Sequence, residues 1–241
     1  MSIEILNINL KFRKYTSGVT HLKTYIAELF KFTSVRYEEF YALSDLTLRI
    51  PTGDRLGIVG LNGAGKSTFL KLIAGIYSPS SGVLKIDGNI APLLEIGSGF
   101  HPELTGRENV RLNCALLGLG QNETSQKEPE IFRFAELEHV ADQQVKYYST
   151  GMNLRLGFSI CAAVEPDILI IDEFFAGGDH HFIEKSRDRL IQLISSARIL
   201  IMVSHDLTYI REFCNRVIWL DAGIVKADGG VDEVLTLYQN S

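Results

Sequence analysis

One octapeptide restricts the possible folds of this chain more than any other feature. Residues 60–67 read Gly-Leu-Asn-Gly-Ala-Gly-Lys-Ser and fit the pattern G-x-x-x-x-G-K-[ST] without a mismatch. Glycines let backbone N–H groups turn inward around an anion, because they lack the Cβ atom that would block the turn. Residues 55–59 read as a buried strand before the loop, and an apolar-faced helix begins near Lys66. The pattern therefore predicts a phosphate-binding loop between a strand and a helix.

The loop and the start of its helix supply most of the candidate nucleotide-binding residues. The positive end of the helix points at the anion, and Lys66 adds a full charge near the β and γ phosphates. The Ser67 hydroxyl can ligate Mg²⁺. The residues expected to bind the nucleotide here are Gly60, Asn62, Gly63, Ala64, Gly65, Lys66, Ser67 and Thr68.

Two adjacent acids follow another apolar run. Asp172 and Glu173 come directly after Ile168–Ile171, about a hundred residues beyond the loop. Adjacent residues at a strand end point in opposite directions. We therefore expect Asp172 to face the metal and Glu173 to face an attacking water.

Composition excludes several classes of protein. Apolar residues make up 46% of the 241 residues and charged residues 22%, as in ordinary globular proteins. The formal net charge is −5, which disfavours nucleic acid as the main partner. Cys114, Cys161 and Cys214 are far apart, so we expect buried thiols rather than a metal or redox motif. No apolar run approaches the roughly 20 residues of a membrane-spanning helix.

The order of apolar patterns predicts an α/β architecture. Residues 3–12, 43–50 and 81–95 read as strands, whereas 167–171 and 199–203 are continuous apolar runs typical of buried parallel strands. Helical spacing dominates residues 98–160, with a polar break at 120–129. Residues 16–40 predict an inserted amphipathic helix, whose face packs on its own domain or docks near a membrane.

With these motifs in place, the chain resembles the ATP-binding-cassette (ABC) ATPases over essentially its full length. Residues 148–152, Tyr-Ser-Thr-Gly-Met, are similar to the family signature Leu-Ser-Gly-Gly-Gln and keep Ser149 and Gly151. In the family this segment caps the γ-phosphate bound by the opposite subunit. The resemblance implies a P-loop NTPase (ABC ATPase) core of the α/β class, with N-terminal antiparallel β elements and a helical subdomain.

Further positions carry the resemblance. Residues 176–179 align with the segment that crosses the family's dimer interface, and His205 aligns with the switch histidine, which can contact the γ-phosphate. Glu95 stands where the family has a metal-ligating Gln. The aromatic residue that stacks on adenine is expected to be Tyr15, with Tyr41 as the alternative.

Residues 93–106, the Tyr-Ser-x-Gly-Met signature and the insertion at 16–40 resemble the polysaccharide exporters of O-antigen, capsule and teichoic acid. The resemblance implies an ATPase that uses ATP and Mg²⁺, with Ser67, Asp172 and Glu95 at the metal and Glu173 and His205 in catalysis. It implies a homodimer on the cytoplasmic face of the cell membrane, bound to a separate permease. The alternatives are another ABC exporter, for lipid or drug, and a soluble ABC ATPase. Residues 1–241 are expected to form one nucleotide-binding domain without a C-terminal carbohydrate-binding domain.

Overall fold

The computed structural model describes residues 1–15, 37–93, 99–173 and 180–241, and its strands form two sheets. The three-stranded antiparallel sheet has the order β2 (Tyr37–Pro51), β1 (Ser2–Tyr15), β4 (Ser81–Ile86). The larger sheet has the order β5 (Ile90–Leu93), β6 (Ile168–Asp172), β7 (Ile199–Val203), β3 (Arg55–Val59), β8 (Arg216–Asp221), β9 (Ile224–Gly229). Its strands run parallel except β9, which pairs antiparallel with β8.

The central strands are the continuous apolar runs, as the sequence predicts. All five residues of β7 are buried, as are the first four of β6, because helices cover both faces of a parallel sheet. Helix α2 (Lys66–Ile73) buries Phe69 and Leu70 in a core shared with both sheets. On the opposite face lie α6 (His180–Ser196), α7 (Leu207–Phe213) and α8 (Val231–Gln239).

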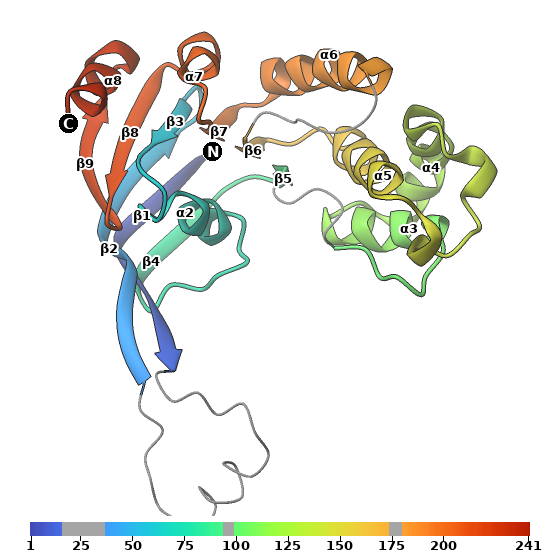
Figure 1. Cartoon of the computed structure of the whole chain (residues 1–241), viewed down its shortest axis with the longest axis horizontal. Coiled ribbons are helices and arrows are strands. Elements are labelled where there is room, and N and C mark those ends of the chain that lie inside the picture. Colours follow the sequence, from blue (N-terminus) through green and yellow to red (C-terminus); the bar gives the residue numbers. More distant parts are fainter. Residues whose placement is uncertain (16–36, 94–98, 174–179) are drawn as a thin grey trace, which may run out of the picture.

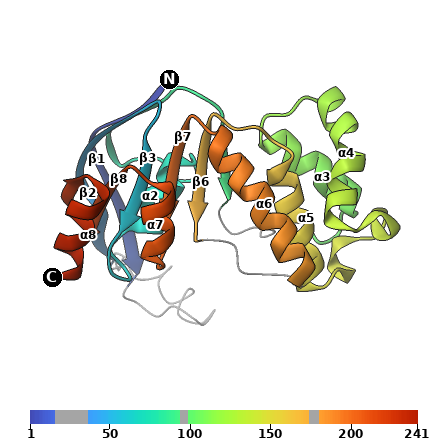
Figure 2. The same cartoon turned by 90° about the horizontal axis from the view of Figure 1, so that it is seen from above.

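A separate group of helices lies between β5 and β6 in the chain. It contains α3 (Gly106–Leu116), α4 (Gln121–Ala135) and α5 (Thr150–Ala162), with short 3₁₀ turns at Glu138–Val140 and Val145–Tyr147. Figure 1 shows these helices set apart from the strands, and Figure 2 shows α6 running beside α5. They have a core of their own, so this region packs as a helical unit against the sheet.

The helix expected over residues 16–40 is wrong at its C-terminal end. Residues 37–40 belong to β2, where Tyr37 pairs with Tyr15 and Phe40 with Phe12. Aromatic cross-strand pairs stabilise a hairpin, which explains why these residues extend the strand. Residues 16–36, which make up most of the predicted helix, lie outside the described residues. The two strands thus form a long arm that leaves the body of the sheet (Figure 1).

The polar break expected at residues 120–129 is also wrong, because α4 passes through Pro129. The helix buries Thr124, Glu128 and Ile131 along one side, and this burial offsets the backbone hydrogen bond that proline removes. The expectation of buried cysteines is confirmed for Cys114 and Cys214, whereas Cys161 is partly exposed. Burial raises the pKa of the Cys161 and Cys214 thiols to about 12 and that of Cys114 to about 11, so all three stay protonated.

Candidate functional site

The phosphate-binding loop lies where the sequence places it, between the end of β3 and the start of α2. Gly63 and Gly65 have left-handed φ values of 82° and 104°, which side chains with a Cβ rarely adopt. Gly60 is required for space, because a Cβ there would lie 2.2 Å from the carbonyl oxygen of Leu220. The backbone path of the loop therefore requires glycine at these three positions.

Lys66 lies inside this loop. Its Nζ donates to the carbonyl oxygens of Gly60 (2.7 Å) and Leu61 (3.0 Å). Burial lowers the pKa of Lys66, against the opposing effect of Asp172 and Glu173. The ammonium group is thus held by two backbone carbonyls at the place where phosphate oxygens could replace them.

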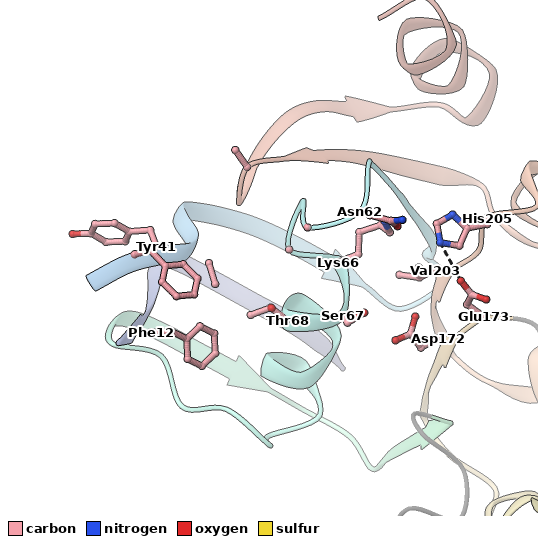
Figure 3. A pocket seen from close by; sticks show the side chains of 15 residues that line it. Phe12, Tyr41, Asn62, Lys66, Ser67, Thr68, Asp172, Glu173, Val203 and His205 are labelled. Carbon is pink, nitrogen blue, oxygen red and sulfur yellow. Dashed lines mark ion pairs between the residues drawn. The ribbon is translucent and has the colours of Figure 1, made fainter. Parts of the chain in front are cut away.

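The loop opens into a cavity of about 560 Å³. The predicted residues Asn62, Gly63, Gly65, Lys66, Ser67, Thr68, Asp172, Glu173 and His205 line it, whereas Ala64 is buried beside Gly60. Figure 3 shows that β6, β7 and the loop bring these side chains together from separate parts of the chain. The carboxyl ends of neighbouring parallel strands meet at one sheet edge, which explains the convergence.

Asp172, the last residue of β6, is the candidate carboxylate ligand for a metal ion. Its side chain is half-buried and hydrogen-bonds to Ser67. Burial raises the pKa of Asp172, and the bond from Ser67 opposes that shift. A hydroxyl and a carboxylate are ligands that suit Mg²⁺, which completes its octahedral shell with phosphate oxygens and waters. The described residues contain no group of three or more His, Cys, Asp or Glu that could hold a metal alone.

Glu173 departs from regular strand geometry, contrary to the expectation that it simply points away from Asp172. Its φ is 67°, a left-handed value, and its N–H donates to the carbonyl oxygen of Val203 at 2.9 Å. The two carboxylates consequently line the same cavity. Glu173 Oε1 lies 3.2 Å from His205 Nε2, and both side chains are more than half exposed (Figure 3).

The predicted signature residues lie elsewhere. Ser149 caps the N-terminus of α5, where its Oγ accepts from Met152 N at 3.2 Å and its N–H contacts Met152 Sδ at 3.4 Å. Ser149 is exposed and Gly151 half-buried, and neither lines the phosphate cavity. Figure 1 shows α5 and α2 in different parts of the molecule. Within one chain the structure does not bring the signature to the phosphate loop.

Three described aromatic residues line the cavity beyond Thr68: Phe12, Phe40 and Tyr41. The Phe12 ring lies 5.9 Å from Phe40 and 5.2 Å from Tyr77. Phe12 and Phe40 were not predicted from the sequence, although the many aromatic residues on the two strands that pair here were a usable signal. Tyr15 pairs with Tyr37 at the end of β1, and its side chain lies outside the described part.

Glu95 and residues 176–179 likewise lie outside the described residues, so their predicted roles stay predictions. Among the helices of the described ranges, none is both long enough and apolar enough to cross a membrane.

Comparison with known proteins gives a consistent result. Residues 43–176 match the family model described as ABC transporter. The chain is 39% identical over 210 residues to the O-antigen export system ATP-binding protein RfbB of Klebsiella pneumoniae, covering 87% of this chain and 85% of the relative. It is 37% identical over 239 residues to the teichoic acids export ATP-binding protein TagH of Staphylococcus saprophyticus, covering 99% and 88%. A Myxococcus xanthus RfbB is 43% identical over 200 residues, 83% of this chain, but the match spans only 46% of that longer relative.

Solved structures agree on the fold. The ATP-binding subunit of an ABC transporter superposes with a TM-score of 0.70 at 26% identity, covering 99% of this chain and 94% of that one. A dimeric ATP-binding cassette in a post-hydrolysis state, bound to ADP and Pi, superposes with a TM-score of 0.68 at 23% identity, covering 95% and 98%. The expected fold class, an ABC ATPase core with an N-terminal antiparallel sheet, is confirmed.

Proposed function

Because the chain belongs to the ABC transporter family and is an ABC ATPase that hydrolyses ATP, we propose that it powers export of a lipid-linked polysaccharide through a separate membrane permease. The observation that supports this most is the match to RfbB and TagH proteins over 87% and 99% of the chain. Those relatives are named for O-antigen and teichoic acid export. These relatives export different glycans, so they support a class of exported glycan and do not identify a single one.

We assign the chemistry to the residues of the phosphate cavity. The backbone N–H groups of the loop and Lys66 hold the phosphates, which displace the carbonyls that Lys66 now contacts. Ser67 and Asp172 would hold Mg²⁺, which neutralises charge on the phosphates when bound. Glu173 orients the attacking water, and His205 lies 3.2 Å away, within reach of the γ-phosphate side of the cavity.

The adenine base needs a flat apolar surface at the far end of the cavity. Phe12, Phe40 and Tyr41 are the aromatic residues of the described part that line the cavity. Stacking on such a ring contributes roughly 1–3 kcal/mol per base. The described residues therefore favour Tyr41 and its neighbours, while Tyr15 stays a prediction.

The separation of Ser149 from the phosphate loop supports a two-subunit mechanism. Cassettes of this family form dimers, as the solved dimeric relatives do. We propose a homodimer in which the signature of one copy closes on the ATP held by the other. Closure would pull on the permease at the cytoplasmic face of the membrane, and hydrolysis would let the dimer open.

The test is co-expression with candidate polysaccharide permeases, followed by purification and ATPase assay of the complex. We expect a stable complex whose ATPase activity falls by orders of magnitude in Glu173→Gln, because this change keeps the shape and removes the carboxylate. A matched control is Glu165→Gln, an exposed acid shortly before β6. Full activity of Glu173→Gln would remove Glu173 from the mechanism. Failure to co-purify with any of the polysaccharide permeases would contradict the proposed substrate class.

A further inference from the structure

Tyr148, the residue before the signature serine, is buried and anchored. Its side chain is 7% exposed, and its hydroxyl donates to the carbonyl oxygen of Val140 at 2.7 Å. Burial raises the pKa of Tyr148, so the phenol stays neutral and keeps its proton for this bond. The family signature has Leu at this position, which could fill the space but could not donate.

The phenol also explains a glycine in another part of the chain. A Cβ on Gly106 would lie 2.3 Å from the Tyr148 hydroxyl oxygen and 3.1 Å from the carbonyl oxygen of Ala141. Gly106 does not have a left-handed φ, so its glycine is required by space and not by backbone conformation. Tyr148 and Gly106 therefore fit each other as a pair.

Gly106 ends a strap that we define as residues 100–106. The strap lies antiparallel to residues 143–146, with a bridge between Thr105 and Gln144. Val145 N donates to Leu104 O at 2.9 Å, and Lys146 N donates to Pro102 O at 3.0 Å. Lys146 Nζ also pairs with Glu103 at 2.8 Å. Backbone hydrogen bonds and an ion pair thus join the strap to residues 143–146, which lead to the signature.

The strap is rigid in its own right. Asn109 is fully buried, and its side chain accepts from His101 N at 2.7 Å and donates to the carbonyls of His101, Leu104 and Thr105. Thr105 caps α3 through a capping box with Glu108. The hydrogen bonds of Asn109 and the capping box of Thr105 together fix the strap against α3, which favours one geometry.

We propose that Tyr148 is a positioning residue, which sets Ser149 against the ATP of the partner subunit by locking it to the strap at Gly106. The proposal rests on the two-subunit mechanism above. Ser149 is held from one side by its own cap on α5 and from the other by Tyr148. Without the hydrogen bond from the phenol, Tyr148 no longer holds Ser149 in place. The exposed serine then samples positions in which it does not contact the nucleotide of the partner subunit.

The test uses Glu173→Gln as the parent, because we expect this variant to bind ATP without turnover. Tyr148→Phe keeps the ring and removes the bond to Val140. We expect ATP affinity of the monomer to stay within twofold, since the phosphate loop is distant, and ATP-driven dimer affinity to fall about tenfold, the loss of roughly 1.4 kcal/mol. Calorimetry measures the first quantity and sedimentation the second.

A matched control separates positioning from simple loss of stability. Ile160→Val removes one methyl group from the same helical core that buries Tyr148, but at the far end of α5. We expect Ile160→Val to lower the unfolding midpoint about as much as Tyr148→Phe while leaving dimer affinity unchanged. Equal loss of dimer affinity in both variants would show that Tyr148 is only a core residue and would overturn the proposal.

Gly106→Ala completes a double-mutant cycle. In the parent it clashes with the hydroxyl, so dimer affinity should fall more than tenfold. In the Tyr148→Phe background the 2.3 Å contact is gone, and the ring carbon Cζ lies 3.2 Å from the added Cβ. The loss caused by Gly106→Ala should then be at least threefold smaller. Strictly additive losses would contradict the paired contact, whereas a parent that fails to dimerise with ATP would refute the two-subunit mechanism and this proposal with it.

Discussion

The different surroundings of two neighbouring carboxylates depend on the backbone φ angle of one residue, Glu173. Asp172 ends a strand and is half-buried against Ser67, whereas Glu173 adopts a left-handed φ and is exposed beside His205. The sequence predicted both acids and their division of roles. It could not predict the left-handed turn, because such a conformation costs a non-glycine residue roughly 1–2 kcal/mol and is imposed by surrounding structure, here the bond from Glu173 N to Val203 O.

The raised pKa of Asp172 predicts a conflict between stability and function. Burial disfavours its charged form, so the folded-state pKa lies above the ordinary value near 3.9, and ionisation at neutral pH destabilises the nucleotide-free protein. We expect Asp172→Asn, which carries no charge at any pH, to raise the unfolding midpoint of the nucleotide-free protein at pH 7.5. The gain should shrink as pH falls through the folded-state pKa, while Mg²⁺-dependent ATPase activity is lost at every pH.

Asp221→Asn is the matched control, since Asp221 also ends a strand but its side chain is 45% exposed, near Lys226. It should leave the unfolding midpoint nearly unchanged. Scanning calorimetry without nucleotide, between pH 5 and 8, measures both variants. A midpoint for Asp172→Asn below that of the unmodified protein would mean that the carboxylate stabilises the site, contrary to the expected sign.

At the scale of elements, the apolar pattern predicted the strands whose structure depends on a short stretch of sequence. The buried strands β6 and β7 were readable because continuous apolar runs have few other structures available. Helix α7 was missed, because its seven residues are too few to show a period. The passage of α4 through Pro129 and the assignment of β4 and β5 to different sheets depend on distant partners, which spacing along the chain does not reveal.

One of those distant partnerships yields a prediction for α4. Glu128, 7% exposed, forms ion pairs with Arg107 and with Arg111, whose Nε lies 3.0 Å away. Removing one partner of a buried pair typically costs 3–5 kcal/mol, and because both arginines reach solvent we expect Glu128→Ala to cost about 3 kcal/mol. Urea unfolding monitored by circular dichroism measures this loss.

Glu130→Ala is the control, because Glu130 lies on the same helix and is exposed. It should change the free energy of unfolding by less than about 0.5 kcal/mol, as surface substitutions do. Equal effects of the two variants would show that the ion pairs of Glu128 contribute nothing beyond helix propensity.

At the scale of the molecule, the proposed two-subunit mechanism requires a second chain to complete each site. The phosphate loop and its acids lie at the edge of the large sheet, while Ser149 lies on the helical unit (Figure 1). The resemblance to ABC ATPases predicts that the signature serves the opposite subunit, and the separation of Ser149 from the phosphate loop agrees with that prediction. Composition and periodicity alone could not predict this, because nothing in one chain's pattern marks a residue that acts on a second copy.

The cap at Ser149 allows this division to be tested with little disturbance of the fold. Ser, Asp and Asn are comparably good N-caps, so Ser149→Asp and Ser149→Asn should both preserve α5. The two replacements match in size and differ in charge. If Ser149 contacts the γ-phosphate bound by the partner subunit, only the aspartate variant places a negative charge against it. Even at an effective dielectric constant near 20, such a contact costs about 4 kcal/mol at 4 Å.

In the Glu173→Gln background we expect both variants to bind ATP as monomers with unchanged affinity, because the phosphate loop is intact. ATP-driven dimerisation, measured by sizing chromatography, should be retained at least in part by Ser149→Asn and be at least tenfold weaker for Ser149→Asp. Equal dimerisation of the two variants would mean that no phosphate approaches Ser149, and the signature would then have to act elsewhere than on the nucleotide of the second subunit.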